Sequence, residues 1–202
     1  MPHKGHSEQW AESLDVFLSE WTRWNDKINL TSEKSETAVI ERHIFDSLQY
    51  ARAVKDDQGA VMDIGSGAGF PGIPLKVIFP GLFFVLVESQ RKRANFLRSC
   101  VRSMDLQKIE VLNQRAEEIS SKYFEKFDLV LFRAVGEISY CLKMATPFLK
   151  VGGQVVIKKE PEASKPESLL QDEKIFEFSH ETLLKGGSGA TSKLMVFNKR
   201  FT

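Results

Sequence analysis

From residue 60 onward, short apolar runs alternate with longer segments of helical pattern, and this alternation restricts the possible folds more than any other feature. The runs are AVMDI (60–64), LFFVLVE (82–88), KIEVL (108–112), FDLVLF (127–132) and QVVIK (154–158). Unbroken apolar runs are typical of strands buried on both faces, and strands that alternate with helices pair in parallel. The pattern therefore predicts parallel strands joined by helices.

Two more strand-like runs end the chain, KIFEFSHETL (174–183) and KLMVFNKRF (193–201), and a loop containing GGSGAT joins them. Neighbouring strands joined by a glycine-rich loop form a hairpin. We therefore predict an antiparallel hairpin at the end of a seven-stranded, doubly wound, Rossmann-like α/β sheet. In such a sheet the ligand binds at the carboxyl ends of the first strands.

The first part of the chain has a different pattern. Apolar residues recur at helical spacing from Trp10 to Ile28, and a second helix is expected over about residues 36–54. We therefore predict an N-terminal helical extension (1–56) packed as one unit with an α/β domain (57–202).

Composition restricts the compartment and the partners. A formal net charge of +1 argues against a histone-like nucleic-acid binder but allows a local basic patch. Cys100 and Cys141 are too few for a disulfide framework, which favours a reducing compartment. We find no signal peptide, membrane span or metal-ligand cluster in the sequence. We therefore expect a cytoplasmic protein without a membrane or metal partner.

The glycine-rich segment MDIGSGAGFPG (62–72) is the expected ligand loop. A P-loop is excluded, because no Lys followed by Ser or Thr comes after the glycines. The dinucleotide fingerprint G-x-G-x-x-G fits Gly67, Gly69 and Gly72; a second register, D-x-G-x-G-x-G, runs from Asp63 through Gly65, Gly67 and Gly69. Asp63 would repel a pyrophosphate but attract the ammonium and sulfonium of S-adenosylmethionine. The second register, and this cofactor, are therefore favoured.

Glu88 ends the second apolar run. An acidic side chain at this place can accept hydrogen bonds from both ribose hydroxyls. NAD and S-adenosylmethionine enzymes both need this contact, so Glu88 indicates a ribose without choosing between the cofactors.

The stretch DIGSGAGFPGIPL (63–75) resembles the glucose-inhibited division protein B (RsmG) family, the 16S ribosomal RNA guanine-N7 methyltransferases. Further matches follow along the chain: WNDKINLTS (24–32), RHIFDSL (42–48), KRANFL (92–97), NQRAEE (113–118), FRAV (132–135) and VIKK (156–159). The resemblance is close over about residues 20–160. It implies a class I methyltransferase fold, S-adenosylmethionine as cofactor, and methylation of guanine N7 in the decoding region of the small-subunit RNA.

The resemblance also implies roles for single residues. Gly65 and Phe70 would contact the cofactor from the glycine loop. Independently of the resemblance, an aromatic ring on this loop such as Phe70 could stack on the adenine or on the target base. Ala116 and Glu117 would flank the adenine. Arg133 would lie where the methionine end or the target is held.

Three residues depart from the family pattern. Phe132 stands where Ser is common before the Arg, Glu88 where Asp is common, and Lys159 where Gly usually follows the Lys. The first changes the surroundings of Arg133, and the second lengthens the reach to the ribose.

Guanine N7 already carries a lone pair, so methyl transfer to it needs positioning rather than a general base. Besides Arg133, we expect Arg115 and Lys158, at or just past strand ends, to contact the substrate. Asn29, His43 and Asp46 would order the wall of the site. For His43 the alternative is a capped or core-facing helix histidine beside Asp46.

The expected RNA-binding surface is the helix after the second strand. Residues 89–115 contain seven basic residues and two acidic ones. The predicted contacts are Arg91, Lys92, Arg93, Arg98 and Arg102. We place this basic face at the cofactor end of the sheet, where it favours contact with an RNA backbone. A merely solvated basic face is the alternative.

The expected partner is 16S rRNA or the small ribosomal subunit, with the protein acting as a monomer. N7 lies on the major-groove edge, which side chains cannot reach in A-form RNA, so the target guanine must be in a loop or splayed out. Two other functions stay open: an RNA-binding or assembly factor without turnover, and a small-molecule methyltransferase, which the basic helix disfavours.

Overall fold

The computed structural model describes residues 4–55, 58–163, 175–186, 189 and 191–200. Their strands form one seven-stranded sheet in the order β3-β2-β1-β4-β5-β7-β6. The strands are β1 (Ala60–Ile64), β2 (Phe83–Val87), β3 (Ile109–Leu112), β4 (Phe127–Arg133), β5 (Leu149–Lys159), β6 (Phe176–Lys185) and β7 (Thr191–Lys199). Strands β1 to β5 pair in parallel, and β7 pairs antiparallel with both β5 and β6. The predicted fold class is thus confirmed.

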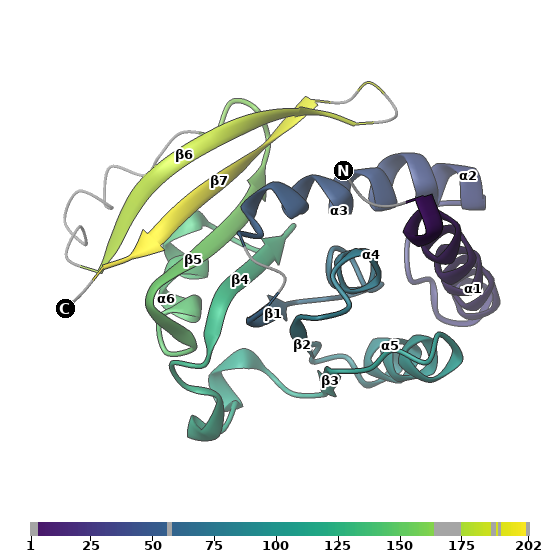
Figure 1. The fold of residues 1–202 in the computed structure, drawn as a ribbon, viewed down its shortest axis with the longest axis horizontal. Helices are drawn as coiled ribbons and strands as arrows, with labels where there is room; N and C mark the ends of the chain where they lie inside the picture. Colours follow the sequence, from purple (N-terminus) through teal and green to yellow (C-terminus); the bar gives the residue numbers. More distant parts are fainter. Residues whose placement is uncertain (1–3, 56–57, 164–174, 187–188, 190, 201–202) are drawn as a thin grey trace.

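Helices cover both faces of the sheet, with α1, α4 and α5 on one side and α6 on the other (Figure 1). These helices are α1 (Lys4–Ile28), α4 (Gly72–Ile78), α5 (Arg91–Ser103) and α6 (Ile138–Ala145). Two short 3₁₀ turns, η3 (Ala116–Glu118) and η4 (Ser121–Tyr123), lie between β3 and β4. No helix within the described part of the chain is both long and apolar enough to cross a membrane.

The unbroken apolarity of the parallel strands follows from this two-sided cover. In β1, Val61 packs into the core beneath α1, α4 and α5, whereas Met62 and Ile64 pack into the core beneath α6. Successive side chains of a strand point to opposite faces. Both faces are apolar here, so the usual alternation of polar and apolar residues is lost.

The second N-terminal helix runs without a gap from Glu36 to Ala53, as the sequence predicted, but its geometry changes along four successive pieces. These are α2 (Glu36–Val39), a π-helical turn η1 (Ile40–Ile44), α3 (Phe45–Gln49) and a 3₁₀ turn η2 (Tyr50–Ala53). Ser35 caps the first piece by accepting a hydrogen bond from the Ala38 amide. A π-helical turn widens the helix locally and often lies at a functional site.

The N-terminal helices share a core with the sheet. Phe17 and Tyr50 are fully buried in the same apolar cluster as β1 and α4 residues, and the Tyr50 hydroxyl donates to the Phe132 carbonyl of β4 at 2.9 Å. The predicted boundary after residue 56 falls on residues outside the described ranges and stays a prediction.

Candidate functional site

The glycine loop joins the end of β1 to the start of α4. Gly65, Gly67 and Gly69 all have positive φ angles, of 79°, 53° and 86°. A Cβ atom on Gly69 would also lie 2.9 Å from the Ile73 side chain. The glycines at spacing two are therefore required by the loop's own conformation.

Gly72 has a different role. Its φ is not positive, but a Cβ atom would lie 2.4 Å from Leu86 and 2.7 Å from the Asp63 carboxylate. Its amide donates to Asp63 Oδ2 at 3.1 Å. This glycine lets α4 pack closely on β1 and β2, so its match to the dinucleotide fingerprint needs no phosphate to explain it.

Asp63 is fully buried at the end of β1. Its Oδ1 atom has no hydrogen-bond partner among the described residues, although Oδ2 binds the Gly72 amide. Burial raises the pKa of Asp63 to about 7. A buried carboxylate with one unsatisfied oxygen, next to a glycine loop, fits a cationic ligand group.

Glu88 follows β2 and is also buried. Its Oε2 accepts from the Gly67 amide at 2.9 Å, and its Oε1 accepts from the Gln90 amide at 2.7 Å. A carboxylate has about four acceptor positions, so two ribose hydroxyls can still bind here. Glu88 therefore fixes the glycine loop in addition to the ribose contact that we predicted.

A cavity of about 140 Å³ opens beside Glu88 at the carboxyl ends of β1 and β2. Among the predicted site residues, its lining contains Gly65, Glu88, Arg115, Ala116 and Glu117. The first helical turn of α6 adds Tyr140 to the wall. Ala116 and Glu117, which we expected to flank the adenine, thus lie in one cavity with Glu88, and the adenosine site itself stays a prediction.

Arg115 belongs to this cavity and not to the group around Arg133. It is exposed and lies at the start of η3, next to Ala116. Arg115 lines the cavity beside Glu88, whereas Lys158 lies at the end of β5, and the substrate contacts expected of both stay predictions.

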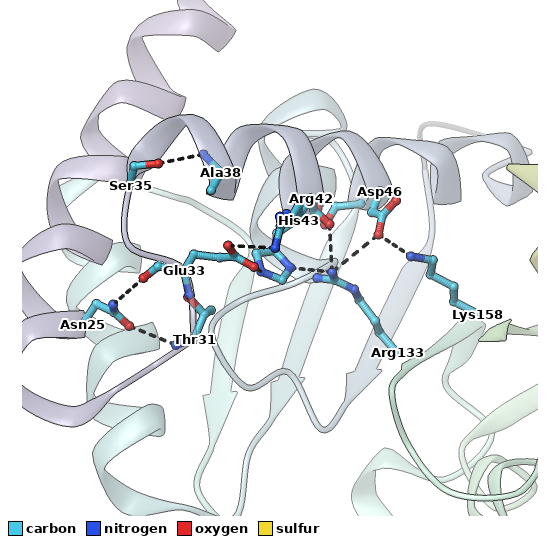
Figure 2. Close-up of polar contacts among 11 residues, drawn as sticks. Asn25, Thr31, Glu33, Ser35, Ala38, Arg42, His43, Asp46, Arg133 and Lys158 are labelled. Atoms are coloured by element: carbon cyan, nitrogen blue, oxygen red, sulfur yellow. Dashed lines mark hydrogen bonds and ion pairs between the residues drawn. The ribbon is translucent and has the colours of Figure 1, made fainter. Parts of the chain in front are cut away.

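Arg133 and Lys158 are paired residues at the ends of β4 and β5, and both reach the N-terminal helices. Arg133 Nη2 lies 2.6 Å from His43 Nδ1 and 3.7 Å from Asp46 Oδ2, and it donates to the Arg42 carbonyl at 3.3 Å. Lys158 donates to the same Asp46 oxygen. Figure 2 shows Asp46 between the two cations.

His43 packs flat on the Phe70 ring, with a centroid distance of 5.1 Å. Burial, together with the charge of Arg133, lowers the pKa of His43 to about 4. The imidazole is therefore neutral at pH 7 and only weakly basic, and the expectation that it is not a general base stays a prediction. The position of His43 combines the two interpretations that the sequence left open: its ring packs against the core, and its Nδ1 atom faces Arg133. We call the group formed by His43, Asp46, Arg133 and Lys158 the charged wall.

The Phe70 ring is not available for stacking on a base, contrary to our expectation. Phe17 contacts it edge-on at 5.4 Å, His43 covers one face, and the Arg133 guanidinium lies 5.4 Å from its centroid. Only 5% of the residue is exposed. A cofactor contact by Phe70 would have to come from its backbone.

Asn29 does not reach the wall either. It has a left-handed backbone (φ 49°) just after α1, and it is exposed. Asn25 holds this connection instead: its Oδ1 accepts from the Thr31 amide at 2.9 Å, and its Nδ2 donates to the Glu33 carbonyl at 3.3 Å (Figure 2). The sequence motif WNDKINLT marked the right segment, but spacing alone could not tell which asparagine turns inward.

The basic helix α5 starts at the carboxyl edge of the sheet and runs away from it. Arg91 and Lys92 are exposed in its first turn, at the cofactor end, as we predicted. Arg102 lies about 16 Å further along the axis, at 1.5 Å per residue. The predicted position at the cofactor end is therefore wrong for Arg102.

Arg93 and Arg98 are half-buried. One Arg93 guanidinium nitrogen is 4.0 Å from where a Cβ atom of Gly67 would lie, so this side chain reaches the glycine loop. Arg98 donates to the Val111 carbonyl at 3.4 Å and to Asn95 at 3.2 Å, so part of its hydrogen-bonding capacity is used within the protein.

Within the described ranges, no group of three His, Cys, Asp or Glu residues could hold a metal ion. Cys100 and Cys141 are both buried and free.

A model of one protein family, GidB, described as rRNA small subunit methyltransferase G, matches residues 11–191. A protein from Caldanaerobacter subterraneus subsp. tengcongensis called ribosomal RNA small subunit methyltransferase G is 40% identical over 152 residues, which are 74% of this chain and 64% of that protein. One of the same name from Acetivibrio thermocellus is 38% identical over 153 residues, which are 73% of this chain and 63% of that protein. The matched region thus spans just under two thirds of these relatives.

Solved structures share the fold. P. horikoshii TYW2, in complex with MeSAdo, superposes with a TM-score of 0.63 at 13% identity, over 84% of this chain and 65% of that one. A SAM-dependent methyltransferase from Aquifex aeolicus gives a TM-score of 0.58 at 16% identity, over 82% of this chain and 94% of that one.

Proposed function

The chain belongs to the GidB family, described as rRNA small subunit methyltransferase G, and from this we propose that it methylates N7 of a guanine in the decoding-region loop of 16S ribosomal RNA. The observation that carries the proposal is the family match over residues 11–191, which includes both the glycine loop and the charged wall. The methyl donor in the proposal is S-adenosylmethionine, which supplies an electrophilic methyl group when bound.

The site's residues fit this cofactor. The unsatisfied Oδ1 of buried Asp63 suits a cationic group, and Glu88 has acceptor positions left for a ribose. Ala116 and Glu117 line the cavity beside them, where the adenine would lie. The tight backbone of the glycine loop lets a ligand approach closely at Gly65 and Gly67.

The charged wall suits an acceptor that needs no proton removed. His43 is neutral and already bonded through Nδ1, so it is not free to act as a base. Arg133 and Lys158 are held in place by Asp46, which also offsets their charge. In the proposal they position the guanine for in-line attack on the methyl group, and nearby carboxylates stabilise the positive charge that passes to the purine.

RNA would reach the site along the carboxyl edge. Exposed Arg91 and Lys92, with Arg93 at the glycine loop, are placed to bind phosphates near the target. Arg98 and Arg102 would contribute less, since they lie further along α5. The partner is 16S rRNA or the small subunit, so the proposal places the protein in the cytoplasm. A monomer stays a prediction.

The decisive experiment maps N7-methylguanine in small-subunit RNA from cells with and without this protein, by borohydride and aniline cleavage. We expect one cleavage site to be present in cells that have the protein and absent from cells that lack it. An unchanged map would refute the proposed substrate. Calorimetry with S-adenosylmethionine tests the cofactor separately. Absence of binding at high micromolar concentration would favour an RNA-binding or assembly factor without turnover. Methylation of small molecules but not of RNA would favour a small-molecule methyltransferase.

A further inference from the structure

Glu33 is a buried carboxylate in the connection between α1 and α2, and no motif pointed to it. Only 8% of it is exposed. Its Oε1 lies 3.4 Å from His43 Nε2, and its Oε2 lies 3.4 Å from Arg42 Nη1. The backbone of Glu33 is fixed as well, because its carbonyl accepts from Asn25 and its amide donates to Thr31 Oγ1. The carboxylate is therefore held against the histidine.

The contact between Arg133 and His43 determines where the imidazole proton lies. A guanidinium group can only donate hydrogen bonds, so His43 Nδ1, at 2.6 Å from Arg133 Nη2, must be the acceptor. A neutral imidazole then carries its proton on Nε2. That nitrogen is buried and makes no hydrogen bond in the structure, but Glu33 Oε1 lies 3.4 Å from it, so a small movement would bring the carboxylate into hydrogen-bonding geometry (Figure 2).

We propose that Glu33 is a positioning residue: it holds His43 in the Nε2–H tautomer, and His43 in turn fixes the Arg133 guanidinium beside the glycine loop. The chain of contacts starts at Glu33 on the N-terminal segment and ends at the tip of β4. This role of Glu33 rests on the proposed function in one respect, namely that Arg133 serves the cofactor and target site.

When Glu33 is removed, a shift of the His43 proton from Nε2 to Nδ1 cannot compensate for the loss. A proton on Nδ1 would point at the Arg133 guanidinium, so Nε2–H must stay, and it would lose the carboxylate that lies 3.4 Å away in its buried surroundings. The ring can relieve this only by turning or by leaving its stack on Phe70. Either movement takes away one of the three polar contacts that hold Arg133, the others being the Arg42 carbonyl and Asp46.

The first test is nitrogen NMR of the imidazole groups in the full chain, which contains four histidines. In the wild type and in Glu33→Gln, whose amide oxygen still accepts, we expect His43 to be protonated on Nε2 alone at pH 7. In Glu33→Ala we expect mixed or exchange-broadened signals. A wild-type His43 protonated on Nδ1, or an unchanged spectrum in Glu33→Ala, would overturn the proposal.

The second test is calorimetry with S-adenosylmethionine. Glu33→Ala should weaken binding roughly fivefold to tenfold, as expected for the loss of about one hydrogen bond, and Glu33→Gln by less than about twofold. Glu41→Ala is the matched control, because Glu41 is an exposed glutamate in the helical turn that carries His43. This variant should bind like the wild type.

A double-mutant cycle separates positioning from general loss of structure. In an Arg133→Gln background, Glu33→Ala should add no further loss of cofactor affinity, because the effect passes through Arg133. Equal losses in both backgrounds would make Glu33 merely structural. If the wild type does not bind S-adenosylmethionine at all, the proposed function fails. The NMR measurement of the His43 tautomer would still test the contact between Glu33 and His43.

Discussion

The two halves of the site, the cavity beside Glu88 and the charged wall, differ in the groups that hold them together. The cavity proposed for the adenosine is lined by residues at and after the ends of β1, β2 and β3 and by α6, and its Glu88 is bonded to two backbone amides. The charged wall consists of side chains, with Arg133, His43, Asp46 and Lys158 in mutual contact. Short motifs indicate single members of this cavity, such as Gly65 and Glu88, although its lining runs from Ile64 to Met144. The wall joins residues 90 and 112 positions apart, so only the tertiary structure brings it together.

Arg133→Ala should have the largest effect on stability, because the wall depends on paired buried charges. Removing one partner of such a group costs about 3 to 5 kcal/mol of unfolding free energy. Urea unfolding measures this loss. Arg91→Ala, which removes an exposed arginine, should change stability by less than about 0.5 kcal/mol. Similar losses for the two variants would contradict the difference between wall and surface.

Gly69→Ala probes the glycine loop that lies beside the cavity, where positive φ angles set the backbone conformation. The change combines a strained positive φ with a contact of 2.9 Å to Ile73, so we expect a loss on the order of 2 to 4 kcal/mol. Gly152→Ala is the matched control, since Gly152 has a φ of 77° and no atom within 4 Å of the added Cβ. It should lose only about 1 to 2 kcal/mol in the same thermal or urea unfolding experiment. Equal losses would mean that the close approach at Gly69 is unimportant.

Asp63 links the halves, and its effect should appear in cofactor binding as a function of pH. Its carboxyl has a raised pKa of about 7, and only the ionised form attracts a cation. Affinity for S-adenosylmethionine should therefore be full above this pKa and fall to about one tenth of that value below it. Asp63→Asn should bind about tenfold more weakly at pH 8, with a flat profile that calorimetry can measure. A pH dependence that survives in Asp63→Asn would assign the titration to another group.

The smallest effects should distinguish the two asparagines of the N-terminal segment. Asn25→Ala removes both side-chain bonds to the Glu33 connection, so we expect a loss of about 1 to 2 kcal/mol in unfolding free energy. Asn29→Gly keeps the left-handed backbone and removes only an exposed side chain, so stability and cofactor affinity should change little. A larger loss for Asn29→Gly would restore our original assignment of this residue to the wall.

The sequence was sufficient for the sheet and for the glycine register. Apolar periodicity reports burial on both faces of a strand, and a carboxylate at a strand end reports the electrostatic demand of a ligand. Lys158 could be placed at the ligand edge from its position at a strand end, whereas Arg133 was indicated by the family resemblance.

Other features needed the tertiary structure. The burial of Phe70 depends on where α1 and the π-helical turn pack, and neither position follows from the loop's own residues. Glu33 gave no motif signal because its partners come from a different segment. The direction of α5 decides which arginines lie near the ligand, and helical spacing alone gives the face but not the end.

The long separation between the two sides of the wall also affects synthesis of the chain. His43 leaves the ribosome 90 residues before Arg133, its hydrogen-bonding partner in the finished protein. At a translation rate of about 5 to 20 residues per second, this delay lasts roughly 5 to 20 seconds. During that interval the N-terminal helices carry Glu33 and Asp46 without the cations of β4 and β5, so the nascent segment can complete its site only after most of the sheet has been made.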